Sequence, residues 1–148
     1  MNKPKLPVIN YGLISDISII RDNDSQNIFL KGTGAQSNQW VHQSTQRAVH
    51  QLWFSLTHVL FPEKANHVTS MAATAVLSAS EPGITTFFEA KYDPQKHTYE
   101  IIGWIGERLW AFELNDEKAR KLWTALDLLI YPAGWEGKTT THRPTDSH

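Results

Sequence analysis

The stretch from Ile84 to Tyr131 constrains the fold more than any other part of the chain. It begins with the apolar run Ile84–Phe88, turns at Asp93–Lys96 and turns again near Gly106, with strand-forming residues between the turns. Such alternation is typical of antiparallel strands that are joined by short hairpins. Asp116 to Tyr131 then follows a helical period. We therefore expect a three-stranded antiparallel meander with a helix across one face.

The two faces of this predicted meander differ in polarity, because successive side chains of a strand point to opposite sides. In its first strand the set that contains Phe88 is the more apolar one, and in its last strand the set that contains Trp110 is. We assign both sets to the core. Around Ile102 and Trp104 in the middle strand both sets are apolar. That face is therefore either covered or an exposed aromatic patch.

The first half of the chain predicts a hairpin and then a long helix. Val8–Ile20 and Asn27–Lys31 are rich in β-formers and flank a polar turn, and Gly32–Asn38 reads as a connector. Apolar residues then recur at three- and four-residue steps over Val41–Phe61, which predicts a helix that Pro62 ends.

The helix boundaries and the segment after them are less constrained by the sequence. Asn38 or Ser37 suits the N-cap of the long helix. Residues 63–80 are compatible with helix or strand, and we favour a short helical turn near 63–70 followed by a strand near Thr74–Ser80. Asn115 or Asp116 is the expected N-cap of the last helix.

These elements predict an α+β domain. An N-terminal hairpin and a C-terminal three- or four-stranded meander form an antiparallel sheet, packed against a long central helix and a C-terminal helix. We assign residues 1–132 to this single domain and residues 133–148, which lack periodicity, to a C-terminal tail. The order of elements in the two halves suggests an internal duplication, but we align no sequence similarity between them.

Composition excludes several functional classes. The chain has no cysteine, which removes disulfides, thiolate nucleophiles and cysteine-based metal sites. Fourteen basic and 15 acidic residues are interleaved along it, so a strong duplex-DNA binder is not expected. No apolar run can span a membrane, and no hydrophobic segment follows the basic residues of Met1–Pro7. We expect a soluble, cytoplasmic protein without membrane contact or cofactor.

The sequence contains no specific pattern for a metal site or a catalytic site. His42, His50 and His58 are spaced by eight residues on the predicted long helix and fan around it, so they cannot bind one ion. Glu89-Ala90-Lys91 has the Glu-x-Lys form used by metal-dependent nucleases, for which Glu81 is the only nearby second acid. Because Glu89 and Lys91 fall on the predicted solvent face, an exposed charge pair is the simpler interpretation.

The six tryptophans are the remaining signal. Trp53 and Trp123 lie on helix stripes, so we assign them, together with Trp110, to the core. Trp40 at the helix entry, Trp104 and Trp135 could instead contribute to a surface cluster, together with Trp110 across the turn, and such clusters mark binding sites.

We therefore predict a non-catalytic binding or assembly protein that acts through a protein partner or self-association. Its expected binding residues are Trp104, Arg108, Trp135 and Lys91. One alternative is a single-stranded nucleic-acid binder whose aromatic side chains stack on bases while Lys91, Lys96 and Arg108 meet phosphates. The second alternative is the Glu-x-Lys nuclease. The sequence predicts no catalytic residue and no metal ligand with any specificity.

Overall fold

The computed structural model describes residues 8–22, 27–34, 37–65 and 83–132. The elements are β1 (Val8–Leu13), β2 (Asp16–Arg21), β3 (Ile28–Thr33), β4 (Gln39–Ser44), α1 (Gln46–Leu60), α2 (Pro62–Ala65), β5 (Ile84–Thr85), β6 (Phe87–Asp93), β7 (Thr98–Ile105), β8 (Arg108–Leu114) and α3 (Asp116–Ile130). They form two four-stranded sheets, sheet A in the order β1-β8-β7-β6 and sheet B in the order β2-β3-β4-β5. The predicted α+β class is confirmed.

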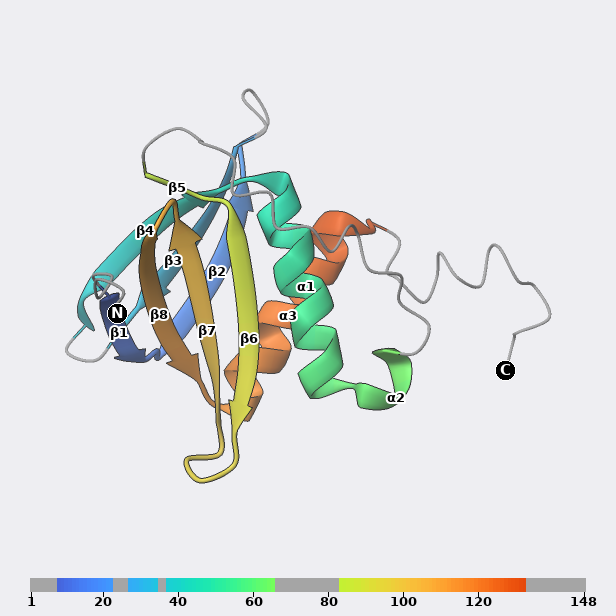
Figure 1. Ribbon diagram of the computed structural model, residues 1–148. Helices are drawn as coiled ribbons and strands as arrows, with labels where there is room; N and C mark the ends of the chain where they lie inside the picture. The colour runs from blue at the N-terminus through green and yellow to red at the C-terminus, as the bar shows by residue number, and fades with distance from the viewer. Residues whose placement is uncertain (1–7, 23–26, 35–36, 66–82, 133–148) are drawn as a thin grey trace, which may run out of the picture.

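Both sheets are mostly antiparallel, and each contains one parallel pair at its edge, β1 with β8 and β4 with β5. In Figure 1 sheet B lies behind sheet A, and α1 and α3 run along one side of both. The core lies between the inner faces of the two sheets and the two helices. Its largest fully buried side chains are Trp53, Trp110, Phe88, Phe112, Ile17, Ile28, Leu30, Leu52, Leu56, Ile101, Leu114 and Leu122.

The C-terminal meander follows the prediction closely. β6, β7 and β8 pair in antiparallel register, and Phe88 and Trp110 are buried as expected. Asn115 caps α3, because its side-chain Oδ1 accepts the Lys118 N–H at 2.8 Å. One detail was wrong: α3 packs mainly on α1 and β2 rather than across its own meander.

The predicted N-terminal strand Val8–Ile20 is in fact two strands that belong to different sheets. The change occurs at Ile14 and Ser15. The Ile14 N–H donates to the Glu113 carbonyl in sheet A at 2.8 Å, and the Ser15 N–H donates to the Thr33 carbonyl in sheet B at 2.8 Å. β-forming composition continues across this point, so propensity alone does not reveal where a strand leaves one sheet for another.

The predicted long helix was wrong over its first turn, and the predicted caps Ser37 and Asn38 were wrong with it. Gln39–Ser44 is strand β4, paired with β3 over its whole length. The helix begins only after Thr45, whose side-chain Oγ1 accepts the Ala48 N–H at 3.0 Å. Val41 had matched the helical spacing, yet it is a strand residue with 53% of its surface exposed. The predicted helix end before Pro62 is confirmed.

The two halves of the chain have the same architecture, and we refer to residues 8–62 and 83–132 as the first and second repeats. Each repeat has a short leading strand, a three-stranded meander and a long helix: β1-β2-β3-β4-α1 and β5-β6-β7-β8-α3. Each leading strand pairs in parallel with the last strand of the other repeat. The two registers correspond, since Leu13 opposes Glu113 as Ile84 opposes Gln43.

This repeat is also visible in the sequence once the strand–helix boundary is placed correctly. Residues 40–62 align with residues 110–132 without a gap. The identical pairs are Trp40/Trp110, Leu52/Leu122, Trp53/Trp123, Leu56/Leu126 and Pro62/Pro132. Assigning β4 to a helix had hidden this similarity, because the strand and the helix of one repeat were then read as one element.

The helices cross with matching contacts. Trp53 Nε1 on α1 donates to Asp127 Oδ1 on α3 at 3.0 Å, and Trp123 Nε1 on α3 donates to Thr57 Oγ1 on α1 at 2.8 Å. Thr57 and Asp127 occupy equivalent positions of the two repeats, so each tryptophan reaches the same place on the opposite helix. Trp53 is fully buried, whereas Trp123 is partly buried and packs at the edge of the core.

Other predictions meet the structure only in part. The helical turn expected after Pro62 is present as α2, whereas the predicted strand Thr74–Ser80 and the tail 133–148 lie outside the described residues. The boundary of the domain at residue 132 stays a prediction. In the described part of the chain, no helix combines the length and the apolar character that a bilayer crossing requires.

Candidate functional site

The outer face of sheet A, formed by β6, β7 and β8 on the side away from sheet B, carries an apolar row at one end. Phe87, Trp104 and Leu109 are direct cross-strand neighbours in this row. The rings of Phe87 and Trp104 pack edge to face, with centroids 5.3 Å apart and planes at 63°. Each of the three side chains is partly exposed. In the described part of the chain no helix crosses this face (Figure 1).

Two further rows complete the outer face. Glu89, Ile102 and Ala111 form the second row, and Lys91, Glu100 and Glu113 form the third. The outer face therefore changes from apolar at the β7–β8 turn to charged at the β6–β7 turn. In the charged row, Lys96 Nζ approaches Glu113 Oε2 at 3.3 Å from the neighbouring turn. Because this pair is largely exposed on the lysine side, it contributes little to stability.

The corresponding end of the outer face of sheet B is polar, although its backbone has the same register. Asp16, Thr33 and Gln39 occupy the places of Phe87, Trp104 and Leu109. Their smaller side chains leave a hollow of about 180 Å³, lined by Asp16, Ser18, Lys31, Gly32, Thr33, Gln39, Trp40 and Val41. The fold is therefore built with polar residues at these positions in one repeat, so it does not itself require the aromatic row of the other.

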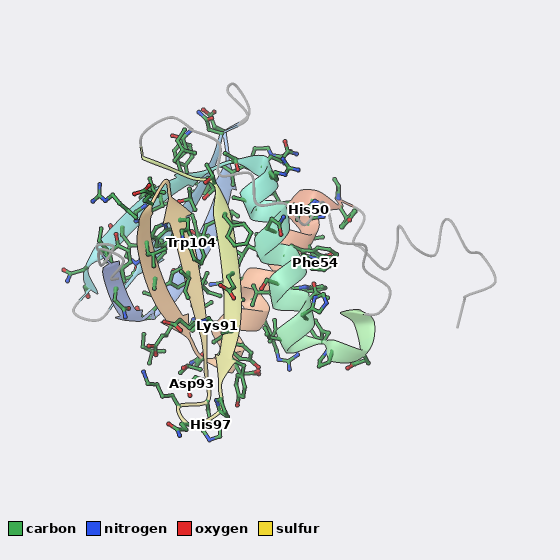
Figure 2. The ribbon with its side chains drawn as sticks, viewed as in Figure 1. His50, Phe54, Lys91, Asp93, His97 and Trp104 are labelled. Carbon is green, nitrogen blue, oxygen red and sulfur yellow. The ribbon has the colours of Figure 1, made fainter. Side chains whose placement is uncertain are left out.

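A groove of about 320 Å³ extends the outer face around the edge of β6 towards α1. Its lining residues are Gln51, Phe54, Ser55, His58, Phe87, Phe88 and Glu89. Figure 2 shows Phe54 on α1, on the far side of β6 from Trp104. Phe87 and Glu89 belong to both the groove and the outer face, so the two surfaces are continuous.

In the first repeat the corresponding space, between α3 and the edge of β2, is bridged by an ion pair. Lys121 Nζ on α3 donates to Asp16 Oδ1 on β2 at 3.0 Å, and this hydrogen bond together with the lysine charge lowers the pKa of Asp16. Gln51 and Phe87 stand at the equivalent positions of the second groove, where no such ion pair can form. At the base of the groove Ser55 Oγ accepts the Ala90 N–H at 2.9 Å, which ties α1 to the edge of β6.

The predicted binding residues are only partly brought together. Trp104 lies in the apolar row, and Lys91 lies on the same face two rows away, roughly 13 Å along the strands at 3.3 Å per residue. Figure 2 shows the two at different levels of the sheet. Arg108 is exposed beside the β7–β8 turn, and by strand alternation it falls on the opposite side from Leu109. Trp135 lies outside the described residues.

The surface position predicted for Trp40 was wrong, whereas Trp110 is buried, as its assignment to the core predicted. Trp40 and Trp110 are buried between the sheets, with ring centroids 5.3 Å apart. They belong to strands β4 and β8 at equivalent positions of the two repeats. Trp104 is thus the one described tryptophan on the outer face of sheet A, and its neighbours Phe87 and Leu109, which the sequence reasoning did not select, complete the row.

A second cluster that the sequence reasoning missed lies in the core around His42. Its Nε2 is 2.8 Å from Tyr11 Oη, and its ring stacks on Trp110 with centroids 3.9 Å apart and planes at 15°. Burial lowers the pKa of His42 to about 4, so the ring is neutral at physiological pH. Phe112 holds the equivalent position in the second repeat. The placement of His42 on a helix had concealed this contact.

The Glu-x-Lys strand gains no partners for metal chemistry in the part of the chain that the structure describes. Glu89 and Lys91 lie on the outer face, where their cross-strand neighbours are Ile102 and Glu100. Glu81 is outside the described residues. Among those described, no group of three histidine or acidic side chains is placed to hold a metal ion.

Comparisons with known proteins do not connect this chain to a family. No family model matches the sequence, and no curated protein and no solved structure is significantly similar to it. Any functional conclusion therefore has to rest on the surfaces of the two repeats.

Proposed function

We propose that the protein is a non-catalytic binding module that docks another protein on the outer face of sheet A. The observation that carries this proposal is the difference between the repeats. Phe87, Trp104 and Leu109 form a partly exposed apolar row where the first repeat has Asp16, Thr33 and Gln39. Because the same backbone is built with polar side chains, the aromatic row is better explained by contact with a partner than by folding.

The composition of the face supports a protein as the partner. Tryptophan in a desolvated pocket is among the residues that dominate binding energy at protein interfaces. Charges of both signs, here Lys91, Glu100 and Glu113, form the row at the other end of the face, as polar residues do at the rim of such interfaces. The groove beside Phe87 and Phe54 adds a recess next to the row, in which an apolar side chain of a partner would be shielded from water.

Nucleic acid is a less suitable ligand for the same face. Glu89, Glu100 and Glu113 lie on it and would repel phosphates. Lys91 and Arg108 do not flank Trp104 together, since one is two rows away and the other falls on the opposite side by alternation. A stacking platform between basic side chains, as single-strand binders use, is therefore not assembled there.

Site-specific photo-crosslinking tests the proposal. Benzoylphenylalanine replaces Ile102 on the outer face of sheet A, and in a matched control it replaces Lys31, the equivalent residue of sheet B. We expect covalent protein adducts from position 102 and few from position 31. Adding Trp104→Thr, which installs the residue of the first repeat, should lower the adduct yield about tenfold, as loss of an interface hot spot does.

The same experiment can contradict the proposal. Equal yields from positions 102 and 31, or adducts that are exclusively nucleic acid, would show that the apolar row is not a protein-docking surface. Circular dichroism of each variant confirms that a lost adduct does not reflect a lost fold. Titration with single-stranded oligonucleotides at low salt, read by tryptophan fluorescence, checks the alternative ligand directly.

A further inference from the structure

We propose that the partner on the outer face of sheet A is a second copy of this chain, bound face to face about a two-fold axis that runs along β7. This inference rests on the proposed function, because it names the occupant of the same surface. It goes further by committing to a symmetric dimer with a defined set of opposed residues.

A closed dimer is expected because the described part of the chain carries one aromatic row of this kind. The row of Phe87, Trp104 and Leu109 lies on the outer face of sheet A, whereas the outer face of sheet B has Asp16, Thr33 and Gln39 at the same places and its apolar side chains Ile20, Phe29 and Val41 in other rows, beside Lys31 and Gln43. A single self-matching face per chain is satisfied completely when two copies meet, which gives a closed dimer. Two such faces on opposite sides of each chain would have produced open-ended assembly instead.

A two-fold axis along β7 gives an apolar centre. It places Trp104 against Trp104 of the second copy and lays β6 of each chain over β8 of the other. Phe87 then faces Leu109 of the second copy, so the apolar rows of both chains meet. Two sheets packed in this way keep their strands within about 30° and lie about 10 Å apart, which interdigitated side chains of this size fill.

The same axis also pairs opposite charges. In the third row it places Lys91 over Glu113 of the second copy, and the pair occurs twice by symmetry. Glu100 lies on β7 and therefore meets Glu100 of the second copy at the axis. This repulsion is a specific signature of the proposed arrangement, because neutralising Glu100 should strengthen the dimer rather than weaken it.

The size of the face sets the expected strength. Three strands about 4.8 Å apart and seven residues at 3.3 Å each give a footprint of roughly 300–350 Å². Standard stable interfaces bury about 800 Å² of accessible surface on each partner. The footprint is less than half of that area, so we expect a weak dimer that forms reversibly.

Sedimentation velocity over about 1–200 µM protein tests the inference. We expect a concentration-dependent monomer–dimer equilibrium. Trp104→Thr should raise the dissociation constant at least tenfold, and Glu100→Gln should lower it several-fold. The control Thr33→Ala, at the position of sheet B that corresponds to Trp104, should leave it unchanged.

A charge exchange then tests the pairing itself. Lys91→Glu and Glu113→Lys should each weaken self-association. A mixture of these two variants should form a heterodimer about as readily as the original protein dimerises, because each opposed pair again has opposite signs. A dimer that persists unchanged in Trp104→Thr would overturn the inference, since it would form through another surface.

Sedimentation and crosslinking together distinguish the absence of a dimer from the absence of a docking surface. A chain that stays monomeric at 200 µM but still gives Trp104-dependent adducts to a different protein would refute the dimer and leave the docking surface intact. A monomeric chain without any such adducts would refute both.

Discussion

The two repeats share one fold but differ in the side chains on the outer faces of their sheets. Both bury a tryptophan at the start of the last strand, place a second one on the helix and end that helix before a proline. The shared tryptophans lie where the repeats pack on each other. The repeats differ on the outer faces of the sheets and at the core position that holds His42 in one and Phe112 in the other. The comparison separates what the fold requires from what it leaves open.

One shared requirement is a glycine opposite each strand tryptophan. Gly32 pairs with Trp40, and Gly103 pairs with Trp110. In each pair the indole covers the glycine, so a Cβ atom there would collide with the ring. The pairs differ in the indole N–H. Trp110 Nε1 donates to Thr85 Oγ1 at 3.0 Å, whereas the buried Trp40 Nε1 has no acceptor among the described residues.

The largest loss of stability should come from replacing these glycines by alanine. In Gly103→Ala the new Cβ would lie 2.6 Å from Trp110 Nε1, and the indole cannot move away without breaking its bond to Thr85. We expect a loss of about 3 kcal/mol or more in the free energy of unfolding, measured with urea. Gly32→Ala should cost a comparable amount, because its Cβ would lie closer still to Trp40 Cζ2, and the Trp40 ring is held by Tyr11 and Trp110 although its N–H has no bond to lose. An unchanged free energy of unfolding in either variant would show that the indole can move away from the new methyl group.

The next effect concerns His42, the polar member of the pair His42/Phe112. Because burial lowers its folded-state pKa to about 4 from 6.5, the folded protein binds fewer protons than the unfolded chain in that window. Its contribution is complete above pH 6.5 and is lost as the pH falls towards 4. The free energy of unfolding should therefore decrease as the pH falls through this window. His42→Phe should remove this part of the acid dependence of urea unfolding.

Controls make the His42 experiment specific. Burial also lowers the pKa of His50, so a residual acid dependence should remain in His42→Phe. An unchanged slope between pH 6.5 and 4 in His42→Phe would mean that His42 is not buried in its neutral form.

The smallest of the three effects should come from Thr85. Thr85→Val keeps the shape of the side chain but removes the acceptor of Trp110 Nε1, which is buried. We expect a loss of about 1–3 kcal/mol, the cost of leaving a buried donor unpaired, measured by thermal unfolding. The second repeat would then resemble the first, where Ile14 precedes the meander at the same place. A variant as stable as the original would contradict this prediction. It would show that a buried indole N–H without an acceptor, like that of Trp40, costs little free energy in this core.

Sequence reasoning succeeded where structure is determined by neighbouring residues. The strands on either side of Asp93–Lys96 and the cap at Asn115 depend on local turn and cap chemistry, and both were predicted correctly. It failed for Gln39–Ser44, because pairing with β3 and not local preference makes this segment a strand. The break at Ile14 was missed for the same reason, since partners distant in sequence determine it.

The candidate site shows the same limit. The sequence left the exposure of Trp104 open because both sides of β7 are apolar, and only the position of sheet B shows which side faces the core. Phe87 and Leu109 could have been selected by pairing the meander in register from its two turns. The surface assignment of Trp40 could not have been corrected in this way, since its burial depends on contacts with Tyr11 and Trp110 in other parts of the chain.

The exchange of leading strands has a consequence for synthesis on the ribosome. β1 leaves the exit tunnel well before its partner β8, which is made more than ninety residues later, as the pairing of Val8 with Leu109 requires. Until then β1 has a free edge on both sides. Nascent chains should therefore be most vulnerable to aggregation and chaperone capture before β8 emerges, and the completed protein should gain protease resistance in one late step.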